Sequence, residues 1–247
     1  MPRRDEIVVY ANALLDVGAW QEYGPAGLQV AGSADVTRIA CGVSSSLELF
    51  ERAVNEGADL VLVHHGLFWR NEPLVIDART RGRLETLFRG NASLLAYHLA
   101  LDAHPELGNN AQLVRALGAE PEATFAGLGL GARFVSPVPI GDLVARVAAV
   151  CEREPVTFLH GPATVSRVAV ATGGGGYELI RAAHEGYDGL LTGEPEEPSL
   201  HTARELGIHL IAAGHHATER LGVQALAAHL GEHFELPWSY IEVANPV

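Results

Sequence analysis

The feature that most constrains the fold is an internal repeat. Residues 36–65 match residues 165–194 without a gap when the sequence is shifted by 129 positions, and nine of the thirty positions are identical. Composition alone would give roughly two identities. Each copy has the pattern of a buried strand, a helix and a second strand, which favours a largely parallel or mixed sheet with helices on its faces. We therefore predict an α/β fold of two βαβ-containing repeats, with mixed sheets flanked by helices.

A second alignment, by 117 positions, extends the repeat to polar residues. His98 then meets His215, and Asp102 meets Glu219. Any two βαβ units can share a hydrophobic pattern, and this is the alternative interpretation, but packing does not require a histidine–carboxylate match. Residues 120–135 are rich in small residues and turn signals. We therefore predict two α/β lobes, residues 1–125 and 126–247.

Composition excludes several functional classes. The formal net charge of −13 disfavours binding to nucleic acid or to anionic membranes. No apolar run approaches the ~20 residues that cross a bilayer, and the N-terminal segment is typical of a helix rather than a signal peptide. Cys41 and Cys151 form no C-x-x-C pair, which argues against a disulfide framework or a thiolate zinc site and fits a reducing cytoplasm. With twelve histidines and one methionine, any metal chemistry should use imidazole and carboxylate ligands.

Two adjacent histidines end the second predicted strand of the first repeat. Successive strand side chains point to opposite faces, so His64 and His65 can reach one site only where the backbone turns. Gly66 supplies the freedom for that turn. Ligands of α/β sheets usually gather beyond the carboxyl ends of strands. A metal-ligand pair and hydrogen-bonded core histidines are both open interpretations of these residues.

Carboxylates and another histidine follow two further predicted strands. Asp102 comes after SLLAYHLAL, whereas His215 and Glu219 come after IHLIAAG. Residues four apart at a helix start share one face, so an imidazole and a carboxylate can meet one ion. Taken singly, Asp102 could cap a turn or helix and Glu219 could pair with Arg220 or face solvent.

Together, these strand ends predict a site for two divalent cations in the cleft between the lobes. Three imidazoles and two carboxylates are too few for two closed sites but suffice for two open ones. Two ions about 3.5–4 Å apart with open positions form a hydrolytic arrangement. Such ligands take zinc, manganese, iron, cobalt or nickel. His98 could be an extra ligand, an orienting group or a general acid or base, and Glu194, the repeat partner of His65, could accept a proton from bound water.

The glycine run Gly173–Gly176 lies between a predicted strand and helix. Such a run can hold phosphate at a helix N-terminus. This one lacks the lysine and hydroxyl of a P-loop and does not fit G-x-G-x-x-G. A tight turn with close backbone packing is the favoured interpretation.

The motifs GLQV, VHHG, HLALDAHPELGNNAQL, TGGGGYELI, LLTGE and AAGHHATER occur in this order. Together they resemble the NIF-three-like dinuclear metal centre hexameric proteins, known as GTP cyclohydrolase 1 type 2 homologues, over nearly the whole chain. The usual Asn of the N-P-x-N-G-L-Q-V segment is absent, because the sequence here is GPAGLQV.

The resemblance implies two intertwined repeats, a toroidal homohexamer and a dinuclear metal site facing the ring's cavity. The ligands that it implies are His64, His65, Asp102, His215 and Glu219, with Asp102 or Glu219 bridging and His98 beside the ions. The family name implies conversion of GTP, but no guanine pocket is evident in the sequence. We therefore expect a metal-dependent hydrolase acting on a small nucleotide-like or phosphorylated substrate. The alternative is a non-catalytic metal-binding scaffold, such as a metal chaperone or regulatory ring.

Overall fold

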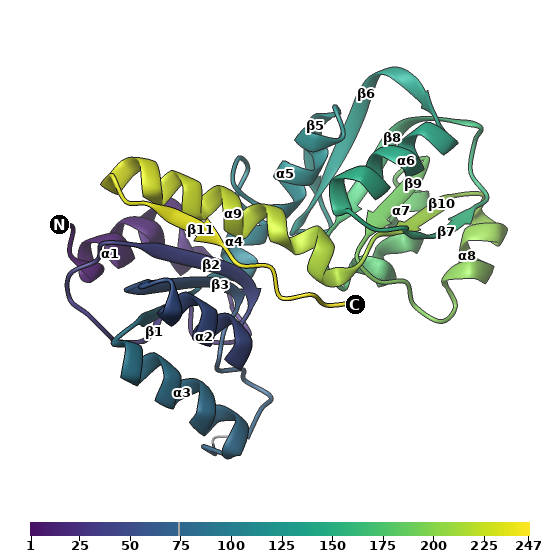
Figure 1. The fold of residues 1–247 in the computed structure, drawn as a ribbon. Helices are drawn as coiled ribbons and strands as arrows, with labels where there is room; N and C mark the ends of the chain where they lie inside the picture. The colour runs from purple at the N-terminus through teal and green to yellow at the C-terminus, as the bar shows by residue number, and fades with distance from the viewer. Residues whose placement is uncertain (74) are drawn as a thin grey trace. The chain divides into compact units, whose positions relative to one another are not determined.

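A computed structural model describes residues 1–73 and 75–247. The chain divides into two compact units. Unit 1 contains Met1–His104 and Gly222–Ala244, and unit 2 contains Pro105–Leu221 and Asn245–Val247. In Figure 1, unit 1 consists of the purple and blue beginning of the chain and most of its yellow end, whereas unit 2 comes from the teal and green middle.

Unit 1 contains a five-stranded mixed sheet in the order β1-β4-β3-β2-β11. Strands β4, β3, β2 and β11 are parallel, and β1 pairs with β4 in the antiparallel sense. The strands are β1 (Gly27–Val30), β2 (Ile39–Ser44), β3 (Leu60–His65), β4 (Ser93–Ala96) and β11 (Trp238–Tyr240). The helices are α1 (Arg4–Leu14), η1 (Val17–Ala19), α2 (Leu47–Asn55), α3 (Ala78–Gly90) and α4 (Leu99–Asp102), with the larger part of α9 (His215–Phe234).

Strand β3, which ends in the two histidines, is buried on both faces. Val61 and Val63 pack in one hydrophobic cluster with residues of α2 and α3, while Leu60 and Leu62 are fully buried on the opposite face. Figure 1 shows α2 and α3 on one side of this sheet and the unit 1 part of α9 on the other. Helices on both faces explain why this parallel strand is apolar throughout rather than alternating.

Unit 2 contains a six-stranded mixed sheet in the order β5-β6-β8-β9-β10-β7. Strands β8, β9 and β10 are parallel, and the remaining pairs are antiparallel. The strands are β5 (Glu120–Phe125), β6 (Gly129–Pro139), β7 (Val156–Leu159), β8 (Thr164–Ala171), β9 (Gly189–Thr192) and β10 (His209–Ala212). The helices are α5 (Asn109–Ala116), α6 (Ile140–Cys151), η2 (Gly175–Glu178), α7 (Leu179–His184) and α8 (Ser199–Leu206), with the first turns of α9.

The two units share hydrogen bonds at equivalent positions, which confirms the predicted repeat. Asp59 Oδ2 accepts hydrogen bonds from the backbone N–H and the hydroxyl of Thr37, at 2.7 and 2.6 Å. Asp188 is the partner of Asp59 when the sequence is shifted by 129 positions. Its Oδ2 accepts hydrogen bonds from the backbone N–H groups of Ser166 and Arg167, at 2.7 and 2.9 Å. Thr37 and Ser166 are themselves partners in that alignment. The three parallel strands β2-β3-β4 and β8-β9-β10 are thus two copies of one arrangement.

The second alignment needs a one-residue correction within its strands. The N–H groups of Ser93 and His209 donate to the carbonyls of Asp59 and Asp188, at 2.8 and 3.0 Å. Ser93 and His209 are therefore equivalent, and they are 116 positions apart rather than 117. Ala96 is thus not the counterpart of Ala213, which lies 117 positions further along the chain. One additional residue, Gly214, follows β10 with φ +94°. It restores the shift of 117 for the histidine–carboxylate motifs.

The compact units do not coincide with the contiguous lobes 1–125 and 126–247. The small residues near position 126 form the turn of the β5–β6 hairpin inside unit 2, where Ala126 and Gly127 have φ of +50° and +85°. The chain crosses into unit 2 after His104 instead. It later returns to unit 1, where β11 pairs with β2. Among the helices of residues 1–73 and 75–247, none combines the length and apolar character that crossing a bilayer requires.

Candidate metal centre

His64 has a defined tautomer at the end of β3. Its side chain is fully buried, and its Nδ1 lies 2.9 Å from the carbonyl oxygen of Tyr97. Because a carbonyl only accepts hydrogen bonds, Nδ1 must be the donor. The Nε2 atom lies 3.5 Å from Asp102 Oδ2, within unit 1. In the neutral imidazole this brings two acceptors together, an arrangement that a cation between them would stabilise.

His65 is oriented by the neighbouring strand. Its Nδ1 lies 2.9 Å from the hydroxyl oxygen of Ser44, which is opposite His65 in the β2–β3 register. The ring centroids of His64 and His65 are 4.8 Å apart, so the two adjacent imidazoles do lie together. Nε2, on the far side of the His65 ring from Ser44, is the nitrogen suited to bind an ion.

The turn after these histidines needs glycine because of space rather than dihedral freedom. The backbone of Gly66 does not have a positive φ. A Cβ on Gly66 would instead collide with the side-chain amide of Gln29. That amide accepts a hydrogen bond from Leu67 N at 2.6 Å and donates to the carbonyl of Pro25 at 2.7 Å. Gln29 thereby holds the turn against the loop that precedes β1.

His98 and Asp102 lie at the two ends of the short helix α4. Glu22, from the loop before β1, accepts hydrogen bonds from the first backbone N–H groups of this helix, those of Leu99 at 3.0 Å and Ala100 at 2.9 Å. Glu22 Oε2 also lies 3.6 Å from His98 Nδ1. Burial alone would raise the pKa of the Glu22 carboxyl, but His98 and the two N–H groups lower it. Glu22 is therefore ionised at neutral pH.

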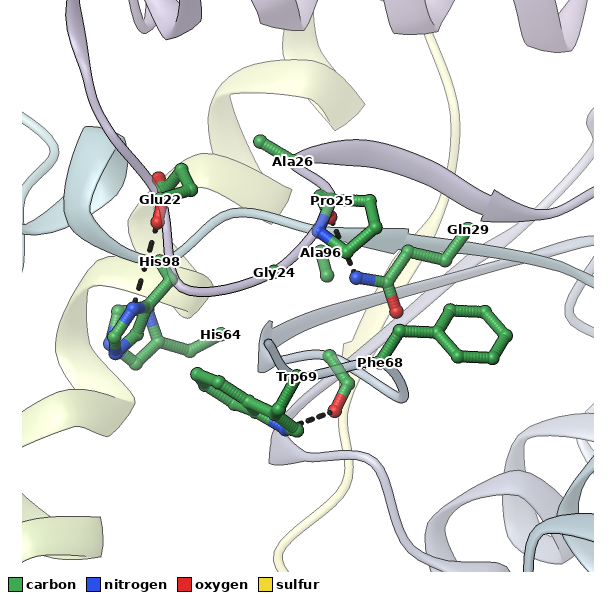
Figure 2. A pocket seen from close by; sticks show the side chains of 11 residues that line it. Glu22, Gly24, Pro25, Ala26, Gln29, His64, Phe68, Trp69, Ala96 and His98 are labelled. Atoms are coloured by element: carbon green, nitrogen blue, oxygen red, sulfur yellow. Dashed lines mark hydrogen bonds and ion pairs between the residues drawn. The ribbon is translucent and has the colours of Figure 1, made fainter. Parts of the chain in front are cut away.

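Three imidazoles of unit 1 form one group. His64, His65 and His98 each offer a ring nitrogen, and these nitrogens lie within 4.8 Å of one another. Figure 2 shows His64 and His98 side by side at one end of a small pocket, with Trp69 and Phe68 along its wall and a dashed line joining Glu22 to His98. This donor set has the chemistry of a site for a borderline divalent cation.

Unit 2 contains a second group, centred on His215. Its Nδ1 donates to Glu194 Oε1 at 2.5 Å, and its Nε2 lies 3.1 Å from Glu219 Oε2. Burial alone would lower the pKa of His215, but Glu219 and Glu194 together raise it to about 9. An imidazole between two carboxylates shares a proton that a cation can replace.

The glycine run packs against this second group. Gly173 has φ +65°, and a Cβ at this position would collide with the Glu219 carboxylate. Its N–H donates to the hydroxyl of Thr218 at 3.0 Å, and its carbonyl accepts from Gly193 N at 2.9 Å. These contacts support the interpretation of a tight turn with close backbone packing.

The residues predicted from the sequence thus form two groups. His64, His65, His98 and Asp102 gather in unit 1, while Glu194, His215 and Glu219 gather in unit 2. Sequence reasoning missed Glu22, Ser44 and Gln29. Ser44 could have been found, because strand pairing places it beside the end of β3. No local pattern points to Glu22, which acts on a helix 77 residues further along the chain.

Comparisons with known proteins identify the family of this chain. A family model described as Duf34/NIF3 (NGG1p interacting factor 3) matches residues 2–246. A protein of Escherichia coli (strain K12) named GTP cyclohydrolase 1 type 2 homolog is 43% identical over 245 residues, with 99% of each chain covered. Among solved structures, the protein ybgI has a TM-score of 0.96 at 42% identity, with all of both chains covered. TTHA1606 from Thermus thermophilus has a TM-score of 0.93 at 36% identity, again over both whole chains. The chain belongs to the Duf34/NIF3 family.

Proposed function

We propose that this protein binds two divalent cations and uses them to hydrolyse a small nucleotide-like or phosphorylated substrate. The proposed ligands are His64, His65, Asp102, His215 and Glu219, with Asp102 or Glu219 shared between the ions. The observation that carries the proposal is the His64 contact pair. With Nδ1 donating to Tyr97, Nε2 is the ring nitrogen that lies 3.5 Å from Asp102 Oδ2. An imidazole nitrogen and a carboxylate oxygen at this separation can bind one divalent cation together.

Bound divalent cations in such sites polarise a substrate oxygen and lower the pKa of water toward neutrality. The protein's own contribution is to hold the ligands. The carbonyl of Tyr97 fixes the tautomer and direction of His64, and Ser44 fixes the direction of His65. Glu194 was expected to accept a proton from water. Its hydrogen bond to His215 Nδ1 instead favours a role in orienting that imidazole.

The relatives named GTP cyclohydrolase 1 type 2 homolog make GTP the first substrate to test. Assembly as a homohexamer belongs to the same proposal. Light scattering of the purified protein should then give six times the mass of one chain.

One observation favours a non-catalytic metal-binding scaffold as a second candidate. The polar groups that line the small pocket of unit 1 bond to the protein itself. Trp69 Nε1 donates to the carbonyl of Gly66 at 3.0 Å, and the side chains of Gln29 and Glu22 bond to backbone groups. These polar groups of the pocket are therefore already engaged and are poorly placed to recognise a substrate. Bound metal without hydrolysis of any compound tested would favour this candidate.

The decisive experiment has two stages. Protein purified without chelator is first analysed for its metals, and GTP, other nucleotides and phosphoesters are then tested with the metal that it contains. Asp102→Ala and Glu219→Ala should abolish turnover while circular dichroism shows an intact fold. Glu205→Ala, on the exposed face of α8, is the matched control and should retain full turnover. Equal turnover by metal-stripped and metal-loaded protein would refute the hydrolase proposal.

A further inference from the structure

We infer that His98 is an additional metal ligand and that Glu22 is the positioning residue that orients it. This inference rests on the proposed metal centre and adds two residues to it. His98 is the third member of the imidazole group of unit 1, beside His64 and His65.

The first step is the fixed position of the Glu22 carboxylate. Only 8% of its side chain is exposed. One oxygen accepts from Ala100 N at 2.9 Å, and the other accepts from Leu99 N at 3.0 Å. The first N–H groups of a helix have no partner within it, so the Glu22 carboxylate satisfies two donors that the helix itself leaves open. Glu22 therefore cannot move without uncapping the helix that carries Asp102.

The second step is the orientation of the His98 ring. Its Nδ1 lies 3.6 Å from Glu22 Oε2. The ring centroid lies 4.9 Å from that of His64 and 5.5 Å from that of His65. Trp69 meets the ring edge-on at a centroid distance of 5.2 Å, which limits other orientations. With Nδ1 toward the carboxylate, Nε2 is the nitrogen on the side of the ring away from Glu22, available to an ion held by the other two imidazoles.

The third step is a related arrangement in unit 2. There Glu194 accepts a hydrogen bond from Nδ1 of His215. Glu219 follows His215 by four residues, just as Asp102 follows His98 by four. The two supporting carboxylates have different origins in the chain. Glu194 follows a strand of the repeat, whereas Glu22 lies before the repeat begins. Histidines that bind metals usually donate their second ring N–H to a carboxylate or carbonyl. His98 and His215 each have a carboxylate beside Nδ1, at 3.6 Å in unit 1 and 2.5 Å in unit 2, so the structure assigns both to the same role.

Cobalt(II) titration tests this inference, because the visible absorption of the bound ion reports the number and kind of its ligands. The metal-free full-length protein would be titrated with cobalt(II) as wild type, His98→Ala, Glu22→Ala and Glu22→Gln. His98→Ala should change the spectrum and weaken binding of one ion. Glu22→Ala should weaken the same ion about 10–100-fold, as expected for loss of a supporting carboxylate. Glu22→Gln should recover part of this loss, because its amide oxygen still accepts one hydrogen bond.

Asp77→Ala is the matched control. Asp77 caps α3 by accepting from Thr80 N at 2.8 Å, as Glu22 caps α4. Its replacement should lower the unfolding temperature and leave the cobalt spectrum unchanged. If wild-type protein binds two ions and the His98 and Glu22 variants keep its spectrum and affinity, the inference is wrong and the proposed centre stands. If the wild-type protein binds no cobalt(II), both fail. Should Glu22→Ala not fold, Glu22→Gln and His98→Ala decide the question.

Discussion

The carboxylate of Glu219 lies directly against the backbone of Gly173, where any side chain would collide with it. The contact joins the start of α9 to the turn after β8 within unit 2. It gives the glycine run a structural reason that involves no bound phosphate. The run leaves space for a proposed metal ligand and helps to determine where that ligand lies.

Gly173→Ala should therefore weaken metal binding by about tenfold or more, since it displaces Glu219. It should also destabilise the fold by about 1–3 kcal/mol, because φ at this position is +65°. Gly186→Ala is the control. It imposes a similar strain at φ +77°, but a Cβ there would approach nothing closer than 3.9 Å. Calorimetric titration should show normal metal affinity for Gly186→Ala, and equal losses in both variants would contradict the argument.

The repeated aspartates provide a test of stability. Asp59→Ala and Asp188→Ala should each reduce the free energy of unfolding by about 2–3 kcal/mol, because each removes a charged acceptor of two hydrogen bonds. Urea denaturation measures the loss. Asp142→Ala, at an exposed position in α6, should change it by less than about 0.5 kcal/mol. Similar values for all three variants would show that the repeated contacts contribute nothing special.

Glu194→Gln tests whether Glu194 orients His215. The amide can still accept one hydrogen bond, but the charge that favours the Nδ1–H tautomer is lost. Metal affinity should fall about tenfold or more, while the unfolding temperature of the metal-free protein should change little, because Glu194 is partly exposed. Undiminished affinity, measured by competition with a chromophoric chelator, would assign Glu194 a different role.

The two cysteines should be unreactive in the folded protein. Burial raises the pKa of the Cys41 thiol to about 12 and that of Cys151 to about 11, so almost no thiolate exists near neutral pH. A disulfide-exchange reagent at pH 8 should modify neither cysteine in native protein and both in urea. Rapid modification of either thiol without denaturant would show that its surroundings open on the timescale of the assay.

The sequence predicted the repeat and the histidine–carboxylate motifs because both depend on local pattern. Parallel strands give long apolar runs, and a strand end followed by a helix start brings polar side chains to one edge of a sheet. Ser46, a residue type favoured at helix starts, caps α2 by accepting a hydrogen bond from Leu49 N at 3.2 Å.

Contacts between distant segments had no such pattern. Glu22 and Gln29 act on residues 77 and 38 positions further along, and neither belongs to a periodic element that reveals its partner. The hairpin near position 126 looked like a boundary because turns within a domain and turns between domains use the same small residues. Gly66 was correctly singled out, but the need for glycine came from the Gln29 side chain, which only the tertiary structure reveals.

The pairing of β11 with β2 has a consequence for the order of events on the ribosome. Unit 2 consists almost entirely of one continuous stretch, so it can acquire its tertiary structure as soon as that stretch has emerged. The N-terminal unit is synthesised earlier but remains incomplete until residues 238–240 are translated, because they supply the strand at the edge of its sheet. Unit 1 is therefore completed after unit 2, and until then the exposed edge of its sheet is open to chaperones or to mispairing with other chains.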